Sequence, residues 1–185
     1  MRADATAALE AWLPPDEGQA RRRREYLQFL AEHDDAMWRE CRIGHLTASA
    51  IVMDEYLERV LLTLHPKVGR WLQLGGHCEP DDPSLREAAR REAIEESGID
   101  EVLISTVPLR LDRHPVPCAG SMSEHLDVQY LATVRADACE VMSAESDDLR
   151  WFPLTGLPED LDGSVRALIL AAMRPRDSGG QIPVS

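Results

Sequence analysis

LGGHCEPDDPSLREAARREAIEESGI occupies residues 74–99 of this chain. It joins a Gly-Gly pair to an acidic segment interrupted by prolines, and then to a run with helical periodicity. Asp82 is the expected N-cap, Pro83 the first helical residue, and Gly98 the residue whose left-handed conformation ends the helix. The stretch therefore predicts a glycine turn that leads through an acidic loop into a helix with sharp boundaries.

Three glutamates lie near the C-terminal end of this expected helix. An apolar stripe that starts at Leu85 continues, at about 100° per residue, into Glu92 and Glu96, with Glu95 beside them. Like charges at these spacings repel one another, and anions at a helix C-terminus oppose the helix dipole. A hard divalent cation such as magnesium or manganese would remove both penalties. The pattern therefore indicates a metal site, with a solvated acidic helix face as the alternative.

The same stretch resembles the signature of the Nudix hydrolases, G-x5-E-x7-R-E-U-x-E-E-x-G-U, where U is aliphatic. Gly76 and the run REAIEESGI that starts at Arg91 match its two ends. Asp82 stands where the signature has its first glutamate, and eight residues rather than seven separate it from Arg91. Either Glu79 or Asp82 could fill that acidic role. The surrounding strand pattern is also similar to the family, so the resemblance covers roughly residues 43–173.

The resemblance implies an α/β fold, namely a Nudix-type α/β/α sandwich with a mixed β-sheet. The sequence pattern, independently of the resemblance, predicts an N-terminal helical extension over residues 1–40. A Nudix-like domain is expected at 41–173. Residues 174–185 are rich in proline, glycine and serine and have no apolar periodicity, so a flexible C-terminal tail is expected there.

The resemblance also implies an activity, that of a metal-dependent Nudix-type pyrophosphohydrolase. Such an enzyme would cleave a diphosphate linkage in a nucleoside diphosphate linked to another moiety, X. Mg²⁺ or Mn²⁺ would be the cofactor, held by Glu92, Glu95 and Glu96 with a backbone carbonyl at Gly76, and a glutamate would act as the catalytic base. Arg91 would orient a glutamate through an ion pair. The alternative is a Nudix-fold sensor that binds a nucleotide derivative without hydrolysis, although the presence of all three glutamates favours the enzyme.

Further candidate residues lie outside the signature. Lys67 and Arg70 precede the glycine turn and could hold substrate phosphates, with exposed loop cations as an equal alternative. Glu145 resembles in its placement the loop glutamate that many Nudix enzymes use as a base or additional ligand. His77 is expected to line the pocket and bind substrate. Cys78 is also expected to line it, because the sequence identifies no basic partner that would make this thiol a nucleophile.

Polar residues also alternate along two expected strands, 102–114 and 125–134. This alternation would place His114, His125 and Asp127 on one face of the sheet. A hydrogen-bonded polar pair or a substrate-binding wall is the favoured interpretation, with a second metal site as the alternative.

The remaining elements follow from apolar periodicity. Residues 16–33 are expected to form a helix after Pro14 and Pro15, with an apolar face that packs on the domain or on a second subunit. The apolar face consists of Tyr26, Phe29 and Leu30. The other expected strands are 44–53, 59–64, 70–74 and 149–152, and a closing helix is expected at 164–173.

Composition limits the partners. The 185 residues carry a net charge of −13, which repels nucleic-acid backbones and anionic membranes. No apolar run approaches a membrane span or a signal-peptide core, and the four cysteines form no C-x-x-C pair. We therefore expect a cytoplasmic protein with a small-molecule nucleoside diphosphate derivative as its partner, without membrane or duplex nucleic acid. A homodimer that forms through the N-terminal helical extension is an alternative to a monomer.

Overall fold

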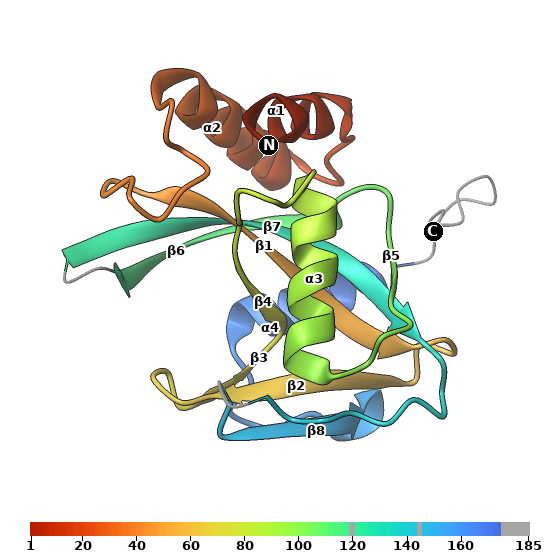
Figure 1. Cartoon of the computed structure of the whole chain (residues 1–185). Helices are drawn as coiled ribbons and strands as arrows, with labels where there is room; N and C mark the ends of the chain where they lie inside the picture. Colours follow the sequence, from red (N-terminus) through yellow and green to blue (C-terminus); the bar gives the residue numbers. More distant parts are fainter. Residues whose placement is uncertain (119–120, 144–145, 175–185) are drawn as a thin grey trace.

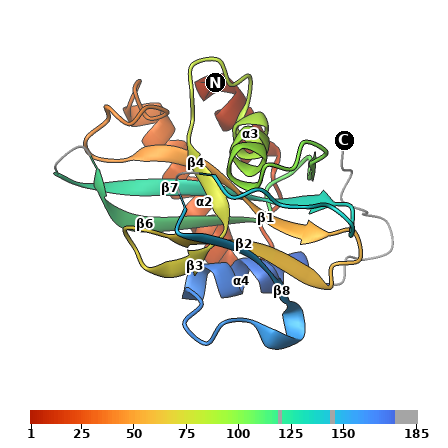
Figure 2. The ribbon, with the colours of Figure 1, turned by 60° about the horizontal axis from the view of Figure 1, so that its bottom comes forward.

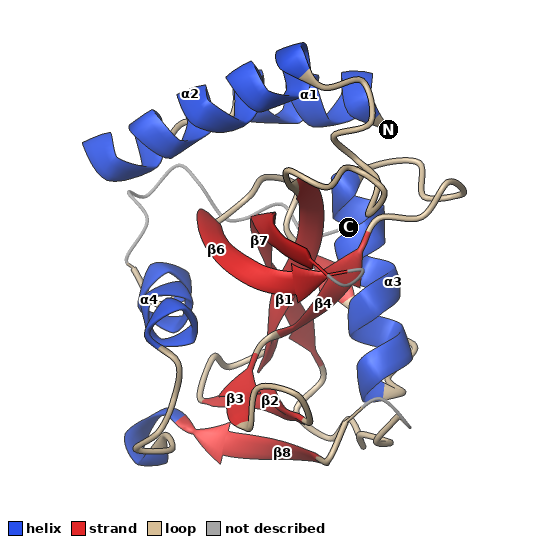
Figure 3. Ribbon diagram, turned by 90° about the vertical axis from the view of Figure 1, so that its left-hand side faces the viewer, coloured by secondary structure: helices blue, strands red, loops and turns tan. Residues whose placement is uncertain are grey.

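The computed structural model describes residues 1–118, 121–143 and 146–174. Its centre is a mixed eight-stranded sheet, with α3 on one face and α4 on the other (Figures 1 and 3). The strand order is β3-β2-β1-β7-β5, while β4 pairs with β1, β6 with β7 and β8 with β2. The elements are α1 (Arg2–Ala11), α2 (Glu17–Glu32), β1 (His45–Asp54), β2 (Arg59–His65), β3 (Arg70–Leu72), β4 (Leu74–His77), α3 (Leu85–Ser97), β5 (Leu103–Ile104), β6 (Arg110–Cys118), β7 (Ser121–Val134), β8 (Asp148–Pro153), the 3-10 turn η1 (Leu154–Gly156) and α4 (Gly163–Ala172).

Strand β1 organises the sheet. It runs parallel to β7 and antiparallel to β2 and β4, and all of its residues are buried. Its side chains alternate between two cores: Ala48 and Ala50 join the core that includes α3, and Ile51 and Met53 join the core that includes α4. The two helical layers are also visible on opposite sides of the sheet in Figure 2. The expected α/β/α sandwich with a mixed sheet is confirmed.

Helix α3 begins later than the sequence predicted. Its N-cap is Ser84, whose side chain accepts a hydrogen bond from the backbone N–H of Glu87, so the assignment of Asp82 as N-cap was wrong. The Asp82 carboxylate instead accepts from the backbone N–H of Glu79 and from Arg91, and both contacts hold it away from the helix start. The C-terminal prediction is confirmed, because Gly98 adopts φ 66° and ends the helix.

The long strand predicted over 102–114 is two strands instead. Strands β5 and β6 both pair with β7, through Ile104 opposite Ala132 and Arg110 opposite Gln129. Between them the Ser105 hydroxyl donates to the carbonyl of Val107. This local hydrogen bond competes with a regular ladder and interrupts the strand.

The N-terminal helices pack on the sheet of the same chain (Figure 1). Helix α2 is capped by Asp16, and its apolar face is covered, with Tyr26 and Leu30 buried. The Tyr26 hydroxyl donates to the backbone carbonyl of Asp112 on β6. The N-terminal helical extension is thus present, while the division of the chain after residues 40 and 173 stays a prediction and residues 175–185 lie outside the described part.

No helix in the described residues is long and apolar enough to cross a membrane.

A glutamine on α2 completes hydrogen bonding at strand β6. The Gln19 side-chain amide donates to the carbonyl of Leu111 at 3.1 Å and accepts from its N–H at 2.7 Å, as a neighbouring strand would. Leu111 is fully buried, so neither backbone group can turn to water instead.

We expect Gln19→Ala to lower the free energy of unfolding by about 2 kcal/mol, because it leaves a buried donor and a buried acceptor unsatisfied. Gln28→Ala is the matched control, since within the described part of the chain that amide bonds to the exposed Glu32 on the same helix. Urea denaturation of both variants measures the difference. Equal stability of the two would show that the Gln19 contact contributes nothing.

Candidate active site

The glycine turn and the glutamates of α3 meet at one place. The backbone N–H of Gly75 donates to Glu96 Oε1 at 3.2 Å. A Cβ atom added to Gly76 would lie 2.7 Å from Glu92 Oε1, which is closer than real Cβ contacts come. The absence of a side chain at position 76 therefore lets the strand backbone approach the Glu92 carboxylate, which a Cβ would force to shift.

Gly75 is required for a second reason. Its φ of 154° is rare for residues with side chains, and an added Cβ would lie 2.3 Å from the Cβ of Ser49 on β1. Strand β4 therefore packs closely on β1 at Gly75, and its backbone also contacts the carboxylates of α3. The Gly-Gly pair sets both distances.

Arg91 binds four groups around this place. Its guanidinium donates to both carboxylate oxygens of Asp82, at 3.0 and 3.1 Å. The Nη1 group also donates to Glu92 at 3.1 Å and to Glu95 at 2.9 Å, and Nη2 donates to the carbonyl of His77 at 2.9 Å. These bonds, that to Asp82 first, raise the pKa of Arg91 well above its usual range. Arg91 thus joins the acidic loop, the glutamates and the end of β4.

The donor set suits a hard divalent cation. Glu92 and Glu96 are half-buried beside the backbone of the glycine turn, and Glu95 is the more exposed third carboxylate. Carboxylate and backbone carbonyl oxygens are the ligands that magnesium prefers. The assignment of Gly76 and the three glutamates as ligands stays a prediction.

The residues predicted outside the signature are more dispersed. The Arg70 guanidinium pairs with Asp162, the N-cap of α4, at 3.2 Å rather than with a glutamate of α3. Lys67 is exposed in the β2–β3 turn. Glu145 lies outside the described residues, so its loop role stays a prediction, as do the phosphate-binding roles of Lys67 and Arg70.

Cys78 is buried behind the glycine turn. Burial raises the pKa of its thiol to about 12, so the sulfur stays protonated at neutral pH. A protonated thiol is a poor nucleophile. This agrees with the prediction that Cys78 is not a catalytic nucleophile.

A polar strip crosses the sheet face opposite α3. Its centre is Asp127 on β7, which accepts hydrogen bonds from Ser49 at 2.6 Å, Thr47 at 3.1 Å and Gln129 at 3.1 Å. Burial raises the pKa of Asp127. Asp112 on β6 lies directly opposite Asp127. The alternation expected for these strands is thus found in three dimensions.

Four histidines line one end of this polar strip. His114 on β6 lies opposite His125 on β7, and His125 lies opposite His45 on β1. The Nδ1 atom of His114 is 3.0 Å from Asp112, and this hydrogen bond raises the pKa of His114. His77, at the end of β4, has its ring beside those of His45 and His125. The sequence analysis expected His77 to bind substrate, which stays a prediction.

His45 was missed by the sequence analysis. The signal was present, because His45, Thr47 and Ser49 alternate with apolar residues at the start of β1. The same alternation was used for the two later strands. The apolar composition of the rest of β1 hid it.

Comparisons with known proteins identify the fold. A family model described as the NUDIX domain matches residues 44–172. A NUDIX-family hydrolase from Clostridium perfringens is 26% identical, with a TM-score of 0.53 over 69% of this chain and 93% of that one. The E. coli dihydroneopterin triphosphate pyrophosphohydrolase is 17% identical, with a TM-score of 0.57 over 69% and 94%. The NUDIX domain of Shewanella oneidensis NrtR, solved with ADP ribose, is 24% identical, with a TM-score of 0.52 over 78% and 94%. A search of the curated proteins gave no match.

These findings agree with the geometry of the glycine turn and α3. The family model covers more than half of the chain and includes β1, the glycine turn, the whole of α3 and the strands that follow. The predicted Nudix resemblance and the predicted enzyme class, a Nudix-type pyrophosphohydrolase, are confirmed at the level of the family. The chain belongs to the Nudix family.

Proposed function

We propose that this Nudix protein hydrolyses a diphosphate linkage in a nucleoside diphosphate linked to another moiety, X, with the help of Mg²⁺ or Mn²⁺. The observation that carries the proposal is the meeting of Glu92 and Glu96 with the backbone of Gly75 and Gly76. It places two carboxylates against the backbone of the glycine turn in a partly buried place, which supports a site for a metal-bound diphosphate.

Glu92, Glu95 and Glu96 would hold the metal together with the Gly76 carbonyl. Such an ion neutralises phosphate oxygens and lowers the pKa of a bound water. The protein supplies the positioning. The Gly75 amide orients Glu96, and Arg91 orients both Glu92 and Glu95 through hydrogen bonds from one nitrogen. One of the glutamates then accepts a proton from the attacking water.

The remaining residues have proposed roles in substrate binding. Lys67 and Arg70 would contact phosphates, His77 would line the pocket beside the glycine turn, and Glu145 would act as an additional base or ligand. Arg70 would have to exchange Asp162 for substrate, which an exposed ion pair allows at little cost.

A substrate screen tests the proposal. Nucleotide sugars, dinucleotides, nucleoside triphosphates and capped RNA are incubated with the full chain and with magnesium or manganese, and phosphorus-containing products are separated by ion-exchange chromatography. Hydrolysis that stops with a chelator and returns with either metal is the expected result. Tight binding of a nucleotide derivative without turnover would instead indicate a sensor. The cytoplasmic location, the absence of membrane and duplex nucleic-acid partners and the oligomeric state stay predictions from composition.

Metal should also stabilise the fold. If Glu92, Glu95 and Glu96 share an ion, the ion relieves their repulsion and adds about 2.7 kcal/mol when free metal is a hundred times its dissociation constant. Thermal melts with and without millimolar magnesium measure this gain. The Glu92→Gln, Glu96→Gln double variant should gain little from metal. Equal gains in both proteins would mean that these glutamates are only a solvated helix face.

A further inference from the structure

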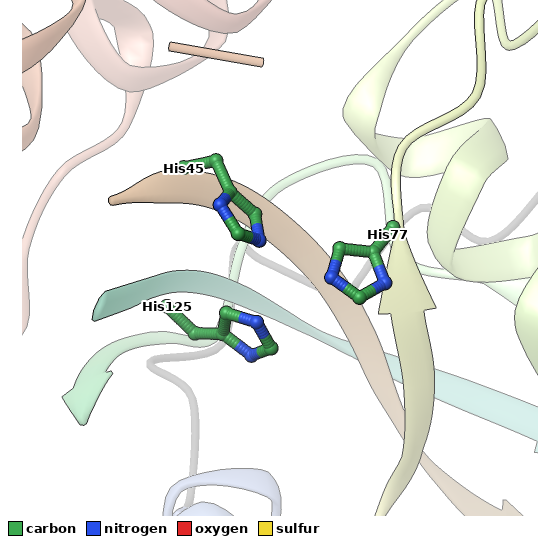
Figure 4. Close-up of side chains that lie close together, drawn as sticks. All are labelled: His45, His77 and His125. Atoms are coloured by element: carbon green, nitrogen blue, oxygen red, sulfur yellow. The ribbon is translucent and has the colours of Figure 1, made fainter. Parts of the chain in front are cut away.

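Three histidine rings from three different strands converge on one point. His45 comes from β1, His77 from the end of β4 and His125 from β7, and Figure 4 shows their rings turned toward one another. The ring centroids are 5.0, 4.9 and 5.1 Å apart, so the arrangement is close to an equilateral triangle. One ligand nitrogen from each ring lies within 4.8 Å of the other two.

The rings have nitrogen atoms that the rest of the described chain does not satisfy. Both ring nitrogens of His45 are buried without a hydrogen-bond partner among the described residues, and the same holds for Nε2 of His77 and Nε2 of His125. The Cys41 backbone lies close enough to affect the pKa of His45, but it completes no hydrogen bond to either nitrogen. Buried polar atoms normally have hydrogen-bond partners, and a buried polar atom without one destabilises the fold. Four such atoms in one place indicate a ligand.

The neighbouring charges identify the kind of ligand. No carboxylate is hydrogen-bonded to any of the three rings among the described residues, and their burial disfavours a positive charge on the imidazoles. Neutral imidazoles attract phosphate poorly. They offer lone pairs, which zinc and its neighbours in the first transition series accept.

We propose that His45, His77 and His125 bind one divalent transition-metal ion of the zinc class, at a site separate from the α3 glutamates. A tetrahedral ion about 2.0 Å from each nitrogen needs nitrogens about 3.3 Å apart. The ligand atoms now lie within 4.8 Å of one another, so the rings must move closer together to hold such an ion. Three protein ligands leave a fourth position open for water or for a group of a bound molecule.

The two metal sites would lie on opposite faces of β4. Gly76 faces Glu92 on α3, and the side chain of the next residue along a strand points the other way. His77 accordingly lies opposite Thr47, whose hydroxyl bonds to Asp127 on the face away from α3. The imidazole site therefore uses none of the glutamates, but a zinc ion there would occupy His77 and exclude the substrate-lining role proposed for it above.

The metal coordination can be measured without any variant. The full chain is saturated with millimolar magnesium to occupy oxygen ligands and then given one equivalent of zinc. The X-ray absorption spectrum of the bound zinc should show three imidazole nitrogens at about 2.0 Å. A spectrum with oxygen ligands alone, or zinc that does not bind, would overturn the proposal.

Variants then locate the site. His125→Gln should weaken zinc binding about a hundredfold or more in equilibrium dialysis. His33→Gln is the matched control, because His33 belongs to a different group of potential ligands, with Asp35 and Cys41. The control and the Glu92→Gln, Glu96→Gln double variant should bind zinc as the parent does. Unchanged binding by His125→Gln, or its loss in His33→Gln or in the glutamate double variant, would contradict the proposal.

Discussion

Glu96→Gln should lower the turnover number about a thousandfold on the true substrate, which is the size of effect that follows loss of one preorganised charge-stabilising group. Glutamine keeps the shape of the side chain, and its carbonyl oxygen can still accept the hydrogen bond from Gly75. It removes one of the negative charges that would hold the metal. The fold should therefore survive while the chemistry is lost. Steady-state kinetics with magnesium and a thermal melt of the same preparation measure both quantities.

Glu87→Gln is the matched control for this variant. Glu87 lies in the first turn of the same helix, and its carboxylate pairs with the neighbouring Arg86 at 3.9 Å. Its substitution should leave turnover unchanged. If Glu96→Gln were as active as the parent, the assignment of Glu96 as a metal ligand would be wrong.

Arg91→Met should lower the free energy of unfolding by about 3 kcal/mol, because it removes the partner of a buried carboxylate. Asp82 is only 7% exposed and receives two hydrogen bonds from the Arg91 guanidinium. Without Arg91 its charge is left in a poorly solvated place, and the carbonyl of His77 also loses a donor. Urea denaturation measures the loss.

A double-mutant cycle with Asp82→Asn isolates the pair. Asparagine keeps an oxygen for the backbone N–H of Glu79 but carries no charge that needs Arg91. The Arg91→Met, Asp82→Asn double variant should therefore be more stable than Arg91→Met alone. Arg135→Met serves as the control, since Arg135 pairs with Asp137 in an exposed position. Strictly additive losses would show that Asp82 and Arg91 do not stabilise one another.

Local sequence determined the features that depend on neighbouring residues in the chain. The helical period of α3, its end at Gly98 and the capping of α2 by Asp16 each involve residues within a few positions of one another. The Gly-Gly turn and the glutamates were found in the same way, because their spacing is a property of one short stretch. The same short stretch carries the family signature, so the resemblance also predicted the fold.

Where predictions from local sequence failed, hydrogen-bond partners outside the local stretch had determined the structure. Asp82 has the side chain of an N-cap, but Arg91, nine positions later, holds its carboxylate and leaves the cap to Ser84. The expected strand over 102–114 was split because both halves pair with β7 around a local bond at Ser105. The propensity of a residue gives the cost of each local conformation. The hydrogen-bond partners that the fold brings to that residue decide which conformation it adopts.

The meeting of three histidines at one point was decided by the tertiary structure. His45, His77 and His125 lie 32 or more positions apart in the sequence, and each is an ordinary strand residue by itself. They meet because β1 pairs in parallel with β7 and antiparallel with β4, which brings the start of β1 and the end of β4 beside His125 of β7. Gln19 reaches Leu111 for the same kind of reason, across 92 positions. The sequence by itself determined the helix, the turn and the acidic cluster, because those need only local spacing; strand register determined which distant polar atoms share a site, because it depends on the packing of the whole sheet.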